Sequence, residues 1–594
     1  MQGIKWKSVG IALVVFMLTA CRDDSASSDP SGPGTDPMTG STGCLTALEL
    51  DVEAYKVGGT IEAGSCHLVN RNLLVNGGLL TIEAGATLKF NADISLIIAE
   101  DGRLTLSGTA EAPVRLVGQE ESVGFWRGLN VSSSGAANVL DHFVIAHAGS
   151  RGWNGGDYST GSIFADTSSG ATLTNCEISE GGGHGFVALE QSELSISECV
   201  IRDHVQGGYV HADAAGNIAA DNEFVDNATN VVRVGFSSAD ILQAETWQNI
   251  GVPWRVETRL NVRAPLTIAP GAVVEFDQDI GAVVAAEGRL TLQGDAEAPI
   301  TLTGVEKTRG YWQGVRVETR GSENTFDHVV FEFAGSRDWN GAEDSSAALR
   351  FEDGSSMSIT NTTFREHGNY AVWAGDAVVF PSFEDNTFAD NAKVAFLRPN
   401  VVRQISPNNT FTENDENVVR ISAASGNFLT QSSTWLALPV PYVVTDQTQI
   451  NSSLTIEEGT RIEFLQDASL NVEGEGSLTA LGTAEAPIVF TSREGEENAG
   501  FWKGVKIATT STSNQLDYVT IQYAGSTSWY GGDDTNGALL VGGGSVAITN
   551  SMIADVTGWG IDLRSDGSVI SCEGTTFSNL TSANVKGSPA GVCM

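Results

Sequence analysis

Short stretches in which aliphatic, β-branched or aromatic residues alternate with polar ones recur along most of the chain. Residues 454–464 (LTIEEGTRIEF) and 469–481 (SLNVEGEGSLTAL) are two examples. A period of two is typical of β-strands with one buried face, and the Gly, Asn, Asp and Ser between such stretches are typical of turns. Helical periodicity is almost absent. The pattern therefore predicts an all-β fold.

The chain also repeats itself on a longer scale. Three similar phrases, GTAEAPVRL, GDAEAPITL and GTAEAPIVF, begin at residues 108, 294 and 482. Each is followed by an aromatic–Trp–x–Gly phrase: GFWRG at 124, GYWQG at 310 and GFWKG at 500. On this basis the chain divides into three long internal repeats, at about 79–250, 265–430 and 453–594.

Within each repeat, apolar residues form columns with a spacing of 23 or 24 residues. The columns hold Ile178, Ile201 and Phe224 in the first repeat, Phe364, Phe388 and Phe411 in the second, and Ile553 and Phe577 in the third. A strand–turn unit of this size cannot bury its apolar face alone, but stacked units share one continuous core. We therefore expect residues 44–594 to form one continuous stack. At a strand spacing of about 4.8 Å, roughly 24 coils would span about 115 Å.

The columns, the GTAxAPI and W-x-G phrases and the Asn-Gly turns together resemble right-handed parallel β-helix proteins of the pectin-lyase-like type. Among these, the chain is most similar to bacterial surface lipoproteins of unassigned function. The resemblance covers roughly residues 45–594. It implies a right-handed parallel β-helix, that is, a solenoid, and it carries no particular activity.

Six cysteines fall in neighbouring pairs: Cys44 and Cys66, Cys176 and Cys199, and Cys572 and Cys593. The members of each pair are about one coil apart, and a coil step of about 4.8 Å lies within the Cα separation that a disulfide tolerates. They are either bonded or stacked as small apolar residues. Because the chain is expected to be exported, we favour disulfides, two of which would tie the ends of the stack.

The N-terminus has the layout of a bacterial lipoprotein signal. Lys5 and Lys7 precede the short apolar run IALVVFMLTA, and LTAC at 18–21 resembles a lipobox. This resemblance implies that residues 1–20 are removed and that Cys21 is lipidated. Residues 21–43 are rich in Ser, Gly, Pro and Asp, which predicts a flexible tether. We expect an outer-membrane lipoprotein of the cell envelope, exposed at the surface.

The charge balance narrows the choice of partners. The chain has 33 Lys+Arg and 73 Asp+Glu, a formal net charge of −40. Such a field disfavours nucleic acid and anionic membrane surfaces as partners. The acidic residues have two interpretations, solubility of an exposed monomer or a supply of oxygen ligands for Ca²⁺.

A Trp-containing phrase is present in all three repeats: AGSRGWNGG at 148, AGSRDWNGA at 334 and AGSTSWYGG at 524. Its Gly and Asn residues predict a loop that leaves the stack. The Trp residues, Trp153, Trp339 and Trp529, either cover apolar surface of a neighbouring coil or form stacking platforms for sugars. In the second case, Asn154 and Asn340 would help to bind the ligand, and Asp157, Glu343, Asp533 and Asp534 are candidate Ca²⁺ ligands. A second set, Trp126, Trp312 and Trp502, is expected to pack in the core.

The evidence for catalysis is weak. The GHG phrase at 183–185 resembles a histidine motif of polygalacturonases, but the NTD, DD and RIK phrases of that family are absent. Asp141-His142 and Asp327-His328 are adjacent in strand-like sequence, so their side chains should point to opposite faces. No Ser-His-Asp phrase, HExxH or CxxC is present. If a catalytic site exists, the first repeat is the best candidate, because only there do these residues occur together: His142, His147, Asp157 and His184.

Three functions remain open at this point. We favour a non-enzymatic surface lipoprotein that acts as a carbohydrate-binding or cell-surface adhesion scaffold. The alternatives are a polysaccharide lyase or glycoside hydrolase with a site on the β-helix face, and a purely structural envelope spacer.

Overall fold

The computed structural model describes residues 44, 46–133, 138–321, 323–340, 346–423, 426, 428–531, 536–587 and 593. The chain divides into a unit of Met1–Leu45 and a unit of Thr46–Met594, and the fold below is that of the second unit. The signal peptide, Cys21 and the tether at 21–43 lie outside the described residues. Within the described part, no helix is both long and apolar enough to cross a bilayer.

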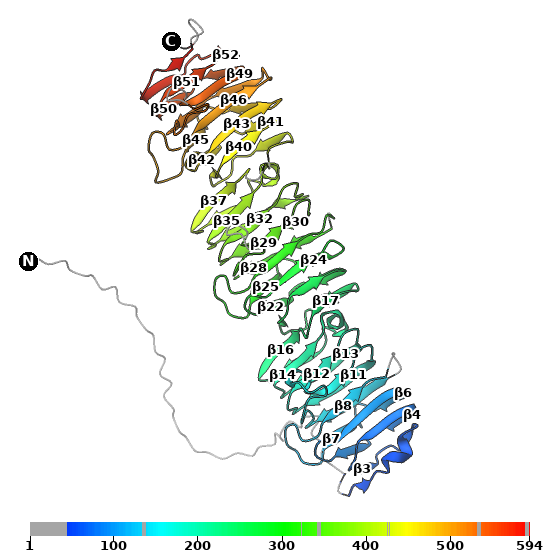
Figure 1. Cartoon of the computed structure of the whole chain (residues 1–594). Helices are drawn as coiled ribbons and strands as arrows, with labels where there is room; N and C mark the ends of the chain where they lie inside the picture. The colour runs from blue at the N-terminus through cyan, green and yellow to red at the C-terminus, as the bar shows by residue number, and fades with distance from the viewer. Residues whose placement is uncertain are drawn as a thin grey trace, which may run out of the picture. The chain divides into compact units, whose positions relative to one another are not determined.

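Parallel strands of successive coils lie side by side along the second unit (Figure 1). Its first part contains β1 (Leu48–Glu49), β2 (Gly59–Ile61), β3 (Cys66–Val69), β4 (Leu73–Glu83), β5 (Thr87–Phe90), β6 (Ser95–Ser107), β7 (Val114–Gly118), β8 (Gly128–Val131), β9 (Val139–Ala146), β10 (Gly161–Ala165), β11 (Gly170–Ser179), β12 (His184–Ala188), β13 (Glu193–Arg202), β14 (Gln206–Val210), β15 (Glu223–Val225) and β16 (Thr229–Val234). The same sheet continues through β19 (Trp254–Val256), β22 (Val273–Phe276), β25 (Ile300–Gly304), β28 (Val329–Glu332), β31 (Thr363–Arg365), β34 (Thr387–Ala389) and β36 (Thr410–Thr412).

Further sheets form the other faces of the later coils. One consists of β17 (Ala239–Ile241), β20 (Leu260–Val262), β23 (Gly281–Val284), β26 (Gly314–Val317), β29 (Ala347–Phe351), β32 (Tyr370–Ala374), β35 (Lys393–Leu397), β37 (Glu416–Ile421), β39 (Tyr442–Val444), β42 (Arg461–Phe464), β45 (Ile488–Ser492), β48 (Val519–Gln522), β50 (Met552–Val556) and β53 (Thr576–Leu580). Another consists of β18 (Glu245–Trp247), β21 (Pro265–Ile268), β24 (Arg289–Gln293), β27 (Thr325–Asp327), β30 (Ser358–Thr360) and β33 (Phe383–Glu384).

The last sheet belongs mainly to the third repeat. It contains β38 (Ser433–Trp435), β40 (Gln447–Ile450), β41 (Ser453–Ile456), β43 (Ser469–Gly474), β44 (Ser477–Leu481), β46 (Gly504–Thr509), β47 (Asn514–Asp517), β49 (Gly537–Thr549), β51 (Trp559–Leu563), β52 (Gly567–Ser571) and β54 (Val585–Lys586). The helical elements of the described residues are short 3-10 turns: η1 (Val52–Tyr55), η2 (Asp157–Ser159), η3 (Ala212–Asn217) and η5 (Val402–Gln404).

The register of the parallel strands confirms the predicted columns. In the first repeat Ile178 pairs with Ile201 and Ile201 with Phe224, each one coil later. In the second repeat the rings of Phe364, Phe388 and Phe411 stack with centroid separations of 4.9 and 5.4 Å. Like residues of successive coils therefore meet in the core, as expected for a right-handed parallel β-helix.

The Trp residues of the W-x-G phrases fill the core in the same way in each repeat. Trp126, Trp312 and Trp502 are fully buried. Each indole lies parallel to a Phe of an earlier coil, at centroid distances of 4.1 Å to Phe90, 4.2 Å to Phe276 and 3.9 Å to Phe464. Each Nε1 also donates to a backbone carbonyl at 2.8, 2.8 and 2.6 Å, so the one polar atom of the ring is satisfied.

A repeated polar corner corrects the expectation for the Asp-His pairs. His142 and His328 have φ of 48° and 50°, so the backbone is not extended there and the side chains do not alternate. The His142 Nδ1 atom lies 3.0 Å from Asp141 Oδ2, and His328 Nδ1 lies 3.1 Å from Asp327 Oδ1. The side chains of each pair are therefore in contact.

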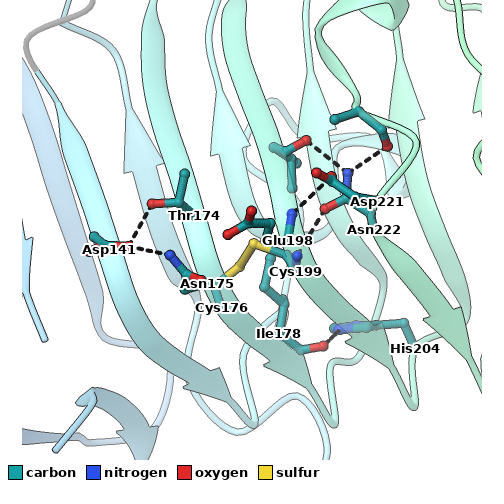
Figure 2. The surroundings of a disulfide bond; sticks show 12 residues. Asp141, Thr174, Asn175, Cys176, Ile178, Glu198, Cys199, His204, Asp221 and Asn222 are labelled. Carbon is teal, nitrogen blue, oxygen red and sulfur yellow. Dashed lines mark hydrogen bonds between the residues drawn. A yellow bond between two sulfur atoms is a disulfide. The ribbon is translucent and has the colours of Figure 1, made fainter. Parts of the chain in front are cut away.

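The Asp of this corner ties two coils together. In Figure 2, Asp141 accepts hydrogen bonds from Thr174 Oγ1 at 2.7 Å and Asn175 Nδ2 at 2.8 Å. Partial burial raises the pKa of Asp141, but these hydrogen bonds outweigh it and hold the pKa below its ordinary value. The same pair of bonds recurs at Asp327 and at Asp517. This column is structural in all three repeats.

The disulfides also connect neighbouring coils. Cys176 and Cys199 are bonded, with Cα atoms 4.4 Å apart (Figure 2), and Cys572 and Cys593 are bonded with Cα atoms 5.1 Å apart. Cys44 and Cys66 are disulfide-bonded as well. Bonding, rather than simple stacking, is therefore the state of the six cysteines.

Candidate functional site

The Trp-containing loops are insertions into otherwise regular coils. Ile145 pairs with Ile178, 33 residues later, whereas Ile178 pairs with Ile201, 23 residues later. The additional residues of the first repeat form the loop 147–160, between β9 and β10, with η2 at its end. The longer coil gives the chain enough length to leave the stack and return to it.

Glycines of three successive coils pack against each other beneath this loop. A Cβ on Gly182 would lie 2.5 Å from the Gly149 carbonyl oxygen and 3.1 Å from the Gly124 Cα, distances that no side chain tolerates. In the second repeat a Cβ on Gly368 would lie 2.8 Å from the Gly310 Cα. The glycines of the repeated phrases are therefore needed for close backbone packing.

In the first repeat, four successive coils line a cavity of 540 Å³ beside these glycines. The lining residues are Gly149, Ser150, Arg151, Gly152, Tyr158, Thr160, Gly182, Gly183, His184, Val205, Gln206 and Arg233. The volume lies within the usual range of small-molecule sites, about 300–1,000 Å³. Glycines contribute backbone to the wall, so a ligand can approach the main chain closely.

His184 explains why the first repeat differs from the others. By strand register it occupies the position of Tyr370 in the second repeat and Trp559 in the third. There, the larger rings lie beneath lysine ammonium groups, with Lys393 Nζ 4.8 Å from the Tyr370 centroid and Lys586 Nζ 5.4 Å from that of Trp559. The smaller imidazole of His184 leaves space in the first repeat.

The electrostatics of the cavity are unusual for such an acidic chain. Burial lowers the pKa of His184 to about 3, so the ring is neutral at physiological pH. Arg233 lies over the Tyr209 ring, pairs with Glu257 and donates to Gln206 Oε1 at 3.2 Å. Arg151 is exposed and has no ion-pair partner among the described residues. The ionised groups of the lining are therefore two guanidiniums.

The Trp residues of the loops are half-buried in all three repeats. The Arg127 guanidinium lies 4.1 Å from the Trp153 centroid, and the same indole stacks on Phe164 at 6.0 Å. Arg127 also donates to the carbonyls of Gly152 and Trp153, which holds the loop against the stack. These contacts favour a covering role for the first of these Trp residues, and its role as a sugar platform stays a prediction.

The other two Trp residues have related surroundings. Trp339 Nε1 donates to the Ala347 carbonyl at 3.0 Å, and Lys503 Nζ lies 4.9 Å from the Trp529 centroid. Lys503 has the position in its repeat that Arg127 has in the first. The neighbouring Asn154 and Asn340 are exposed.

The structure separates most of the predicted catalytic residues. His184 lines the cavity, but His142 contacts Asp141 at the corner, and His147 Nε2 lies 3.2 Å from Glu180 Oε2. Asp157 begins η2, one residue before the lining residue Tyr158. Among the described residues no group of three or more His, Cys, Asp or Glu is arranged to hold a metal. Glu343, Asp533 and Asp534 lie outside the described residues, so the Ca²⁺ prediction stays a prediction.

The sequence analysis did not identify five polar lining residues: Arg151, Tyr158, Thr160, Gln206 and Arg233. They come from different coils, and only the strand register brings them together. The signal that was present is the departure of the first repeat from the other two at the position of His184.

Comparison with known proteins agrees with this geometry. Residues 124–244 match the family described as a right handed β-helix region, and residues 427–539 match the pectate-lyase-like β-helix domain. The fold is a pectin-lyase-like, right-handed parallel β-helix. A search of curated proteins returned no match. The β-helix families thus describe the scaffold, and the first match covers most of the cavity lining.

Proposed function

We propose that this β-helix is a carbohydrate-binding protein of the cell envelope, and that the cavity of the first repeat holds an acidic sugar. The observation that supports this most is a small-molecule-sized cavity whose ionised side chains are Arg151 and Arg233, in a chain of net charge −40. A guanidinium forms paired hydrogen bonds with a carboxylate, which neutral polar groups cannot do as strongly.

The remaining lining groups suit the rest of a sugar. Ser150, Thr160 and Gln206 offer hydroxyl and amide groups for sugar hydroxyls. Tyr158 is 46 % exposed and presents an aromatic surface at the rim. Polar groups converging on a small concave site, with one ring beside them, are typical of ligand specificity.

The charge of the whole chain limits the size of the ligand. A long polyanion would be repelled by the 73 acidic residues, whereas salt screens charges beyond about 8 Å from a short ligand. We therefore favour a short or terminal acidic sugar over the interior of a long acidic chain.

The lining favours binding over cleavage. Glycoside hydrolysis usually requires two carboxylates that flank the bond, but the lining residues include neither Asp nor Glu. His184 is neutral, and Arg233 is committed to Glu257. These side chains can donate and accept hydrogen bonds, but they do not form an acid–base pair.

The proposal includes the place of the protein in the cell. Lipidation of Cys21 would anchor the chain in the outer membrane, and the segment 21–43 would act as a tether for the β-helix. Such a chain would act as a monomeric receptor or adhesion scaffold at the cell surface.

Calorimetric titration of the chain with short uronate oligosaccharides and their neutral counterparts tests the ligand. Arg151→Ala should weaken binding of the acidic ligands about tenfold to a hundredfold, since a hydrogen bond to a charged group contributes about 1.5–3 kcal/mol. Arg337→Ala is the matched control, because Arg337 has the same place in the phrase of the second repeat. It should leave binding unchanged.

Equal loss in both variants, or equal affinity for neutral sugars, would argue against the first-repeat site. Release of new reducing or unsaturated ends during the titration would instead support the hydrolase or lyase alternative.

A further inference from the structure

A serine, a histidine and an aspartate meet at the junction of the first and second repeats. His211 is the N-cap residue of η3, Asp213 lies within η3, and Ser238 precedes β17 on the next coil. His211 Nδ1 lies 2.6 Å from Asp213 Oδ1, and His211 Nε2 lies 3.4 Å from Ser238 Oγ. The histidine is thus placed between a carboxylate and a hydroxyl, with a different ring nitrogen facing each.

The short contact decides the tautomer of His211. An ionised carboxylate has no proton to donate, so the proton in the 2.6 Å contact belongs to Nδ1. In the neutral ring, Nε2 then has a free lone pair directed at the Ser238 hydroxyl. This is the arrangement in which a histidine acts as general base for a serine nucleophile.

Burial differs along the array. Asp213 and His211 are buried, whereas Ser238 is half-buried. Asp213 Oδ1 also accepts from the Gln191 backbone N–H at 3.2 Å, which fixes the carboxylate. The acid and base are therefore held rigidly, and the hydroxyl is at the side open to solvent.

The backbone beside the serine is strained. Phe236 has φ of 80°, which is rare for a large side chain, and it lies two residues before Ser238. Its ring is held by Tyr209 at 4.1 Å and by the rim residue Tyr158 at 6.0 Å. The strained loop therefore lies next to the cavity of the first repeat, and its contacts fix the position of Ser238.

The surrounding charges restrict the substrate class. Asp213, Asp240 and Glu245 lie near the array, and burial together with Asp213 raises the pKa of Glu245 to about 7. A phosphate ester would be repelled by these groups. An uncharged carboxylic ester would not be repelled.

We propose that Ser238, His211 and Asp213 form an acyl-transfer site that hydrolyses an uncharged carboxylic ester. Ser238 Oγ attacks the acyl carbon while His211 Nε2 takes the hydroxyl proton, and that proton then passes to the departing alkoxide, which leaves as an alcohol. Water, deprotonated by the same nitrogen, attacks the acyl-serine, releases the acid and returns the proton to Ser238. No oxidant, reductant or metal is required.

Asp240 provides an internal check on the assignment of the base. Its carboxylate also accepts a hydrogen bond from Ser238, and it pairs with Arg263. Two acceptors therefore compete for one hydroxyl proton. If His211 is the base, Asp240→Asn leaves the serine reactive.

Labelling of the full chain with a fluorophosphonate probe, followed by peptide mass spectrometry, tests the site. The adduct should form at Ser238 and be lost in Ser238→Ala, while Ser237→Ala, which removes the exposed neighbouring hydroxyl, should label normally. Asp213→Asn and His211→Gln should slow labelling and p-nitrophenyl acetate hydrolysis about a hundredfold or more, with β-type circular dichroism retained.

An unlabelled wild-type chain, label distributed over other serines, or loss of labelling in Asp240→Asn would overturn the proposal. Sugar binding at the first-repeat cavity is measured separately, and neither result decides the other.

Discussion

At the residue scale, buried polar side chains that connect coils are as regular as the apolar columns. In each repeat one Asn spans three coils: the Asn138, Asn324 and Asn514 Oδ1 atoms accept from the backbone N–H of a Leu at 2.8, 2.8 and 2.9 Å. Their Nδ2 atoms donate to a carbonyl of the next coil at 2.8, 3.0 and 2.9 Å. The sharp corners of the coils leave backbone groups unpaired, and these amides satisfy them.

Asn324→Ala should therefore destabilise the second repeat by about 2–4 kcal/mol. The change leaves the Leu290 N–H and the Ser356 carbonyl buried without these partners, at about 1–3 kcal/mol each. Urea denaturation followed by circular dichroism measures the effect. The exposed Asn340→Ala is the control, and equal stability of the two variants would contradict the structural role of the corner amide.

Glu245 gives the stability of the junction a pH dependence. Burial, together with Asp213, raises its pKa to about 7, so the folded state holds a proton that the unfolded chain releases near its ordinary pKa. The stability is greatest below that ordinary value and falls as the pH rises to about 7. Glu245→Gln should raise Tm at pH 8 but have little effect at pH 4. A similar gain at both pH values would show that charge is not the cause.

At the element scale, the loops 147–160, 334–346 and 524–536 are additions to coils that otherwise follow a 23-residue step. Their glycines allow the backbone of adjacent coils to pack closely, and Trp153 covers the outer face of β10 at Phe164. The phrase therefore recurs because the fold needs it in each repeat. The cavity arises only where the first repeat has His184 in place of a larger ring.

Trp153→Ala should lower stability by about 2 kcal/mol, because it uncovers Phe164 and removes the contact with Arg127. Trp153→Phe should recover a large part of this loss. Thermal denaturation measures both variants beside the triple Ala variant of Trp153, Trp339 and Trp529. Loss of glycan binding in the triple variant, with unchanged stability, would support sugar platforms instead.

The sequence predicted the repeating geometry well because like residues must stack on like residues. The period of 23 or 24 residues, the Phe364–Phe388–Phe411 column and the burial of Trp312 all follow from that requirement. The alternation rule was wrong at His142, because a positive φ there ends the extended backbone.

Sites formed by residues one or more coils apart were harder to predict. Ser238 and His211 are 27 residues apart, and Arg151 and Arg233 are separated by several coils. Loop lengths change the register between such positions, so no fixed spacing relates them. A motif search along the sequence therefore missed both the array and the cavity lining.

At the scale of the whole molecule, three similar repeats share one β-helical scaffold, and chemistry arises where they differ. Net charge of −40 keeps such a scaffold soluble and disfavours polyanions, whereas two guanidiniums in the first repeat provide a local exception. The second and third repeats fill the corresponding position with Tyr370 and Trp559. One sugar site per chain is therefore expected.

A crystal structure of the chain soaked with a short uronate oligosaccharide tests this expectation most directly. The carboxylate should lie within hydrogen-bond distance of Arg151 or Arg233, with sugar hydroxyls at Thr160 and Gln206 and no sugar at Tyr370 or Trp559. Sugar bound equivalently in all three repeats, or only on the Trp residues of the loops, would contradict it.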